Sequence, residues 1–179
     1  ISKGCPTNVI EGEILAITNR GVGIRINASD IPPIESAEQL SMVPTVNQFL
    51  ELGEGRVVSV LGVSADQVVS IGTKSGVVKR VSTLPEKDSF SLISLSDSDE
   101  VVSASLSDEF LYFVSSQGQV LKFEADLVRP QGLTAGGMQG IKLGNEDYVI
   151  GFGSCSDSSI LLTASEAGDG LLGAEFGKG

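Results

Sequence analysis

The chain has 179 residues, of which 41% are hydrophobic and 20% charged, and its formal net charge is −11 at pH 7. This composition is typical of a globular domain and argues against disorder, and no apolar stretch approaches the length of a membrane helix. The chain has no histidine, which excludes Ser-His-Asp and Cys-His catalysis and His-ligated zinc. We therefore expect no catalytic residue, no metal site and no cofactor in it.

The first residues, "ISKGCPTNVIEG", contain neither an initiator methionine nor a basic-then-apolar signal sequence, so we expect a fragment of a longer chain. Cys5 and Cys155 are too few for the disulfide framework of a small secreted protein, which favours the cytoplasm. The length is that of one domain, and we expect residues 1–179 to form it.

In chain order, four segments share one plan: an apolar run, a turn ending in glycine, and a second apolar run. They are "ILAITNRGVGIRI" (14–26), "VVSIGTKSGVVKRV" (68–81), "LYFVSSQGQVLKF" (111–123) and "ILLTASEAGDGLLG" (160–173). A glycine at this place in a turn supplies a positive φ, as a hairpin between antiparallel strands requires. The turn glycines are Gly21, Gly76, Gly118 and Gly168.

A second turn before a valine-rich strand follows each of the first three segments, at 49–63, 92–106 and 141–154. Two hairpins per repeat give four strands, which is the strand count of a propeller blade. The sequence therefore predicts an all-β, propeller-like fold of four-stranded blades, with about three complete blades and the start of a fourth. The repeats cover roughly 11–64, 65–107, 108–156 and an incomplete 157–179, and residues 37–52 are expected to contain one helical turn at most.

Three cations share one position in this repeat. Arg25, Arg80 and Lys122 each lie four residues after the turn glycine. Apolar neighbours flank Arg25 and Lys122, so the two-residue period of a strand predicts that the cations face outward. Arg20 and Lys74 lie in the turns themselves. Lys79 occupies a position where the other repeats have Ile24 and Leu121.

The charge of the chain is unevenly distributed. Residues 1–90 contain eight basic and ten acidic residues, whereas residues 91–179 contain four and thirteen. A polyanion would approach the first half more readily. Outward cations on successive blades could contact successive phosphates of a duplex, and the turns carry no aromatic platform for single strands. The other interpretation is that outward charges serve solubility and block edge pairing.

At this point the residues resemble a known family. "TKSGVVKRV" (73–81) resembles a recurring element in the C-terminal domains of type IIA topoisomerase A subunits, those of DNA gyrase and topoisomerase IV. "VRPQGLTAGGMQGIKLGNEDYVIGF" (128–152) is similar to the glycine-rich segment of a blade in that family, and "ILLTASEAG" (160–168) to the start of the next blade. The resemblance covers most of residues 11–179.

The resemblance implies a β-pinwheel, a disc whose neighbouring blades exchange a strand. In the family this non-catalytic disc binds and bends duplex DNA along its outer rim and presents it to a catalytic core elsewhere in the same polypeptide. The implied partners are double-stranded DNA, that core and the ATPase B subunit of an ATP-dependent enzyme. The resemblance also implies a bacterial, cytoplasmic protein that does not bind a membrane. The cleavage tyrosine belongs to the core, so Tyr112 and Tyr148 are expected to be structural.

Two features depart from the family's pattern. The chain has no counterpart of the basic box of gyrase, and Leu133 replaces an arginine that is frequent in the glycine-rich segment. With the acidic total charge, these features predict modest, salt-sensitive DNA binding by a divergent or topoisomerase IV-like member of the family. The alternative is an acidic protein-interaction domain with no direct DNA binding. The predicted DNA contacts are Arg20, Arg25, Lys74, Lys79, Arg80, Lys122, Arg129 and Lys142.

Overall fold

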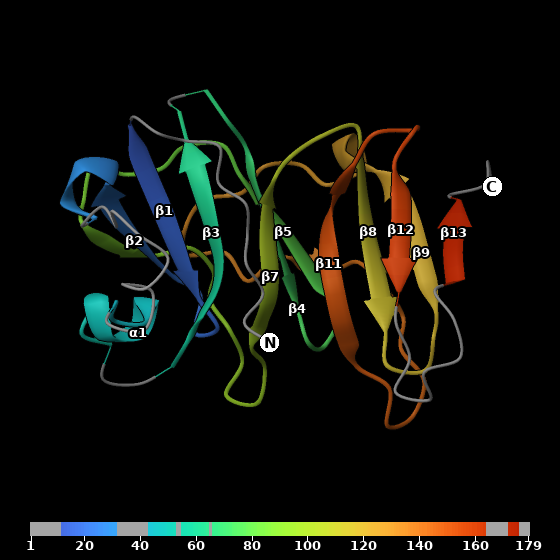
Figure 1. Cartoon of the computed structure of the whole chain (residues 1–179). Helices are drawn as coiled ribbons and strands as arrows, with labels where there is room; N and C mark the ends of the chain where they lie inside the picture. Colours follow the sequence, from blue (N-terminus) through green and yellow to red (C-terminus); the bar gives the residue numbers. More distant parts are fainter. Residues whose placement is uncertain (1–11, 32–42, 53–54, 65, 164–171, 176–179) are drawn as a thin grey trace.

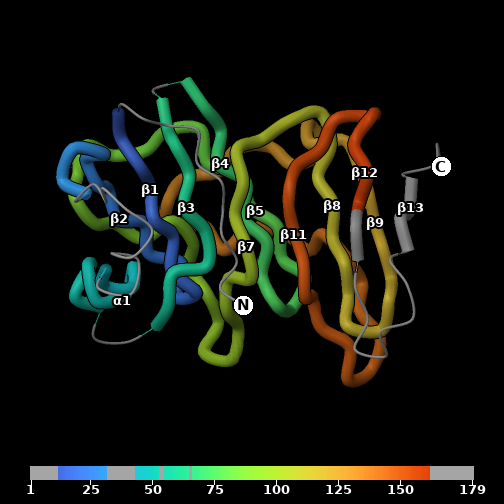
Figure 2. Tube along the Cα trace, in the orientation of Figure 1, coloured from blue at the N-terminus to red at the C-terminus, as the bar shows by residue number. Residues whose placement is uncertain are grey.

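The computed structural model describes residues 12–31, 43–52, 55–64, 66–163 and 172–175. Antiparallel sheets stand in a row along the molecule, with their strands roughly aligned (Figures 1 and 2). We number these sheets blades 1 to 4 in chain order. The first two have the strand orders β3-β1-β2-β6 and β10-β5-β4-β7, the third β11-β8-β9, and the fourth β12-β13. The all-β, propeller-like fold predicted from the sequence is confirmed.

Each blade contains strands with the following bounds. Blade 1 consists of β1 (Glu13–Thr18), β2 (Val22–Asn27), β3 (Val57–Val63) and β6 (Ser89–Ser91). Blade 2 consists of β4 (Val69–Thr73), β5 (Val77–Val81), β7 (Val101–Leu106) and β10 (Met138–Gln139). Blades 3 and 4 contain β8 (Phe110–Ser115), β9 (Val120–Glu124) and β11 (Val149–Cys155), then β12 (Ile160–Thr163) and β13 (Leu172–Glu175). Short helical segments are η1 (Ala28–Asp30), α1 (Val46–Phe49) and η3 (Ala125–Leu127).

The fourth strand of a blade comes from the following repeat. Strand β6 follows β5 in the chain, yet it pairs with β2 of blade 1, and β10 follows β9 but pairs with β5 of blade 2. The second hairpin that the sequence predicted in each repeat is therefore not formed. The valine-rich strands β3, β7 and β11 form as predicted, but each pairs with the first strand of its own blade. Blade 3 has three strands within the described residues.

The glycine turns form as predicted in blades 1, 2 and 3. Gly21, Gly76 and Gly118 have φ angles of 74°, 88° and 82°, in the left-handed region that glycine enters without a Cβ penalty. The hydroxyl oxygen of Thr18, Thr73 or Ser115 accepts a hydrogen bond from the amide just after each glycine. A small hydroxyl residue and a glycine three positions later thus specify the turn. Gly168 lies outside the described residues.

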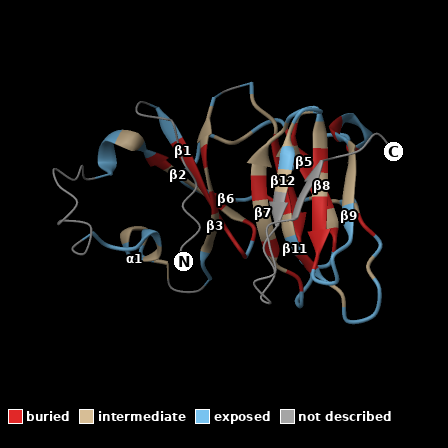
Figure 3. Ribbon diagram, turned by 45° about the vertical axis from the view of Figure 1, so that its right-hand side comes forward, coloured by how far each residue is buried: buried red, intermediate tan, exposed pale blue. Residues whose placement is uncertain are grey.

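Apolar residues pack between successive blades. In β1, Leu15 and Ile17 point toward blade 2, whereas Ile14 and Ala16 point toward the side covered by α1, because successive strand residues face opposite sides. A further cluster, which includes Phe113 and other β8 residues, joins blades 2 and 3. Figure 3 shows the resulting burial along the strands of blades 1 to 3. Inner strands therefore have both faces covered.

The helical turn expected within residues 37–52 is α1, a four-residue helix. Thr45 caps it: the Thr45 side chain accepts a hydrogen bond from the Gln48 amide, and the Gln48 side chain accepts one from the Thr45 amide, which is a capping box. Phe49 packs against the outer face of blade 1. None of the helices in the described ranges is long and apolar enough to cross a membrane.

Candidate nucleic-acid interface

Four exposed cations lie near the glycine turns of blades 1 and 2. Arg20 and Lys74 are turn residues, and both are exposed. Backbone hydrogen bonds place Arg56 and Lys142 at the same edge. The Arg56 carbonyl accepts a 2.8 Å hydrogen bond from the Asn19 amide, and the amide of Ile141, just before Lys142, donates a 3.2 Å hydrogen bond to the Gly76 carbonyl. We call this set the turn-edge cations: Arg20, Arg56, Lys74 and Lys142. In Figure 1 the arrowheads of β1 and β8 point toward this lower edge.

Two neighbours hold the Lys74 ammonium. The Nζ atom lies 3.7 Å from Oε1 of Glu100 and 5.2 Å from the ring centroid of Tyr148. Tyr148 lies just before β11 and is 45% exposed. A cation over an aromatic ring is held by the negative face of the π system. Lys74 is thereby kept at the surface, where it can reach a ligand.

Lys79 lies elsewhere than predicted. Its side chain is fully buried, and Nζ donates hydrogen bonds to the carbonyls of Leu133 and Ala135, at 2.9 and 2.8 Å. Burial lowers the pKa of this amine from 10.5 to about 8, because a low-dielectric interior disfavours the charged form. The expectation that Lys79 reaches a ligand is therefore corrected: this cation joins β5 to the glycine-rich segment.

Arg80 is also buried. One terminal nitrogen of its guanidinium donates to the carbonyls of Ala125 and Val128, at 2.7 and 3.0 Å, and to Asp126 at 3.1 Å. These acceptors belong to η3 and the residue after it, which directly follow β9 of blade 3 in the chain. The predicted outward position of Arg80 is wrong, because blade 3 and its connections cover the second face of β5.

Arg25 and Lys122 are largely covered as well. Their side chains are 17% and 13% exposed, and each forms an ion pair, Arg25 with Glu13 and Lys122 with Asp157. The two-residue period failed here because it assumes that one face of each strand meets solvent, whereas Glu13 and Pro85 contact Arg25, and Phe110 and Asp157 contact Lys122. Of the remaining predicted contacts, Arg129 is exposed but follows η3, away from the turns.

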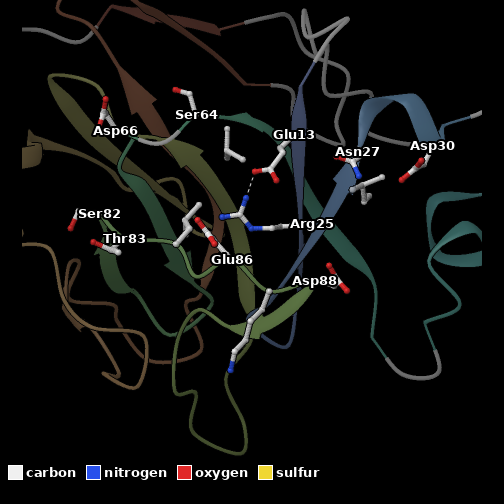
Figure 4. Close-up of a pocket in the computed structure, with 14 residues that line it drawn as sticks. Glu13, Arg25, Asn27, Asp30, Ser64, Asp66, Ser82, Thr83, Glu86 and Asp88 are labelled. Atoms are coloured by element: carbon white, nitrogen blue, oxygen red, sulfur yellow. Dashed lines mark hydrogen bonds and ion pairs between the residues drawn. The ribbon is translucent and has the colours of Figure 1, made fainter.

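The opposite edge of blades 1 and 2 contains an acidic cavity of about 1030 Å³. Figure 4 shows Arg25 pointing into it toward Glu13, with Glu86 nearby. The Nε of Arg25 donates to the Pro85 carbonyl at 3.0 Å. The acidic side chains that line the cavity are Glu13, Asp30, Asp66, Glu86 and Asp88, and its basic ones are Arg25 and Lys87. No group of three acidic, cysteine or histidine side chains placed to hold a metal occurs within the described ranges.

Sequence reasoning missed Arg56 and Glu100, although a signal for both existed. Each directly precedes a strand that begins with valine, as Tyr148 does in blade 3. In all three blades the carbonyl of this residue accepts a 2.8 Å hydrogen bond from the turn, donated by Asn19, Lys74 or Ser116. Aligning the repeats on the third strand as well as on the glycine would have placed both residues at the turn edge.

Comparisons with known proteins agree with this architecture. Residues 12–36 and 109–156 match the family described as "DNA gyrase C-terminal domain, beta-propeller". The DNA gyrase A protein of Helicobacter pylori is 32% identical over 170 residues, which cover 88% of this chain and 20% of that protein. Its counterpart from Salmonella typhimurium is 30% identical over 145 residues, which cover 77% of this chain and 15% of that protein. The chain thus spans a fifth or less of these relatives.

Solved structures share the fold. A DNA gyrase A C-terminal domain superposes with a TM-score of 0.66 at 22% identity, over 86% of this chain and 51% of that one. The C-terminal domain of a DNA topoisomerase IV has a TM-score of 0.66 at 19% identity, over 85% and 50%. The exchanged strands and repeated turns define a β-pinwheel. The chain belongs to the family of C-terminal domains of type IIA topoisomerase A subunits.

Proposed function

We propose that this domain binds duplex DNA through the turn-edge cations and bends it toward the catalytic core of a type IIA topoisomerase. The observation that carries the proposal is the position of Arg20, Arg56, Lys74 and Lys142. In a chain of net charge −11, four exposed cations lie together near two adjacent turns. Lysine and arginine contacts to phosphates need charge and spacing and carry no base readout.

The position of the acidic residues supports an oriented mode of binding. The acidic cavity lies at the far ends of β1 and β2, since Glu13 begins β1 and the turn follows its last residue, Thr18. We expect a polyanion to approach the turn edge more readily than the cavity edge, because the turn-edge carboxylates Asp99 and Glu100 are held by Ser75 and by the neighbouring cations. The domain requires no metal or cofactor for this role. Its proposed partners in an ATP-dependent bacterial enzyme are the catalytic core and the ATPase B subunit.

A salt titration of binding to a linear duplex tests the proposal. Counterion release predicts that log K falls linearly with log salt, with a slope of about −0.9 for each phosphate contact. Four turn-edge cations set an upper slope of about −3.6, well below that of a strongly wrapping protein. Tighter binding to small circles than to linear duplex would support bending. The absence of binding at low salt would contradict the proposal.

The acidic cavity favours a second candidate, a protein-interaction domain that docks a basic segment. Its five carboxylates and 1030 Å³ volume suit lysine or arginine side chains. This candidate predicts that the isolated catalytic core binds the domain and that Asp66→Asn together with Glu86→Gln weakens that binding, with duplex affinity unchanged. Equal core binding by the variant would exclude the cavity as the docking site.

A further inference from the structure

One carboxylate pairs with two of the turn-edge cations, while its neighbour Asp99 accepts hydrogen bonds from the Ser75 amide and hydroxyl. Glu100 directly precedes β7, and its Oε2 accepts a 3.0 Å hydrogen bond from Nδ2 of Asn19. The same oxygen is 3.9 Å from a terminal nitrogen of Arg56, and Oε1 is 3.7 Å from Nζ of Lys74. Glu100 therefore belongs to blade 2 but contacts the turn of blade 1, and a single negative charge faces two cations.

The fold does not require an acid at this position. Its structural task is a backbone one, since the carbonyl of residue 100 accepts the Lys74 amide at 2.8 Å. The equivalent residues of blades 1 and 3, Arg56 and Tyr148, do the same with entirely different side chains. The carboxylate is thus a local feature of blade 2, free to serve a function other than forming the blade.

The geometry indicates that the Glu100 carboxylate screens the charges of Arg56 and Lys74 without blocking access to their side chains. The side chains of Arg56 and Lys74 are 60% and 45% exposed, whereas that of Glu100 is 30% exposed. The hydrogen bond from Asn19, followed by the nearby cations, lowers the pKa of Glu100, so the group is ionised at neutral pH. Ion pairs of this length at a surface contribute at most about 1 kcal/mol, so the two cations remain available to a competing phosphate.

We propose that Glu100 is an intramolecular counter-ion that attenuates the affinity of the turn edge for duplex DNA. This inference rests on the proposed DNA-binding function. Before DNA binds, Arg56 and Lys74 share the Glu100 carboxylate. A phosphate that contacts them must compete with this fixed negative charge, and it also approaches that charge closely. Both effects weaken binding, and neither prevents access.

The test is Glu100→Gln in the complete domain. Glutamine keeps an oxygen that can accept the Asn19 hydrogen bond while it removes the charge. The matched control is Glu124→Gln, which makes the same charge change on an exposed residue that ends β9, at the far end of that strand from its glycine turn. At low salt we expect duplex affinity to rise about three- to tenfold in Glu100→Gln, with a steeper salt slope. Glu124→Gln should leave it within about twofold of the wild type.

A double-mutant cycle assigns the gain to the named cations. Adding Glu100→Gln to a variant that carries Arg56→Gln and Lys74→Gln should give a clearly smaller increase than in the wild type, because the cations that the carboxylate screens are gone and only its direct repulsion of phosphate remains. Thermal unfolding of each variant checks that the fold is retained.

The outcomes separate the two proposals. If the wild type binds and Glu100→Gln binds no better, or more weakly because the carboxylate orders the cations, the screening role is overturned while DNA binding stands. If neither protein binds duplex at low salt, DNA binding by this domain is overturned, and the screening role with it. Binding by Glu100→Gln alone would support screening strong enough to mask the interface.

Discussion

Blades 2 and 3 have the same inner hairpin but use it differently. In blade 2 the three positions around the turn carry Lys74, Lys79 and Arg80, whereas in blade 3 the equivalent positions carry Ser116, Leu121 and Lys122. The cations of blade 2 divide into one exposed residue and two that are buried under neighbouring segments. Charge in one short stretch thus serves two purposes, and the position of each residue in the hairpin determines which.

The difference arises from what covers each blade. The exchanged strand β10 and the glycine-rich segment before it lie against β5. Lys79 donates hydrogen bonds to the backbone of that segment, and Arg80 donates to the carbonyls of Ala125 and Val128 at η3. Strand β9 has no equivalent neighbour within the described part of the chain. Buried cations are tolerated in blade 2 because backbone carbonyl oxygens accept their hydrogen bonds. Four predictions test this comparison.

Arg80→Met should have the largest effect on stability. The substitution leaves the carbonyls of Ala125 and Val128 without the donor they share, at about 1–3 kcal/mol each, so we expect a loss of about 4 kcal/mol. The blade 3 counterpart, Lys122→Met, breaks an ion pair with the exposed Asp157 and should cost about 1 kcal/mol. Urea unfolding measures both variants. Equal losses would show that Arg80 is not part of the blade 2 structure.

Lys79 should make stability depend on pH. Its folded pKa of about 8 lies below the ordinary 10.5, so between these values the unfolded chain retains a proton that the folded chain has released. Rising pH therefore favours folding across this window, by up to about 3 kcal/mol. The neutral amine still has two N–H donors for Leu133 and Ala135. The cost of burying the charge is present below pH 8 and disappears toward pH 10.5.

The control for this pH effect is Lys79→Leu, which installs the residue of blade 3. Both proteins contain Tyr112 and Cys155, whose pKa values burial raises, so the difference between the two stability curves isolates Lys79. Wild-type stability relative to the variant should increase between pH 8 and 10.5. A flat difference curve would mean that the Lys79 pKa is close to that of an exposed lysine.

Gly76→Ala and Gly118→Ala compare the two turns. Both glycines have positive φ angles, so alanine costs about 1 kcal/mol at either. A Cβ on Gly76 would also lie 2.8 Å from the Ile141 carbonyl and 2.8 Å from its Cγ2, whereas one on Gly118 would have no atom within 4 Å. We expect a loss of about 2–3 kcal/mol for Gly76→Ala and about 1 for Gly118→Ala. Similar losses would place the glycine-rich segment elsewhere than against the blade 2 turn.

The sequence predicted the repeat and its turns because each turn is local. A hydroxyl residue, a glycine three positions later and two apolar runs specify a hairpin without help from the rest of the chain. The exchange of β6 and β10 was available only through family resemblance, since its partners are distant in sequence and the short strands have little pattern of their own. The burial of Arg80 was missed for the same reason: η3 and Val128, which cover it, come from the next repeat.

The candidate site was predicted where local position decides exposure. Arg20 and Lys74 are turn residues, and a turn that projects from the sheet leaves them at the surface. Arg56 reaches the same edge through a backbone contact with Asn19 across the blade, so the glycine alignment alone could not identify it. The screening position of Glu100 depends on the packing of blade 2 against blade 1, which no single repeat encodes.

The duplex affinity of one pair of variants tests directly whether DNA contacts the turn edge or the cations within the strands, such as Lys122 of β9. Lys74→Gln and Lys122→Gln each remove one positive charge, the first at the blade 2 turn and the second within β9. Duplex affinity is measured for both across a salt series. We predict that Lys74→Gln weakens binding several-fold and reduces the steepness of the salt slope by about 0.9, with little change for Lys122→Gln. Equal losses, or a larger loss for Lys122→Gln, would contradict binding at the turn edge.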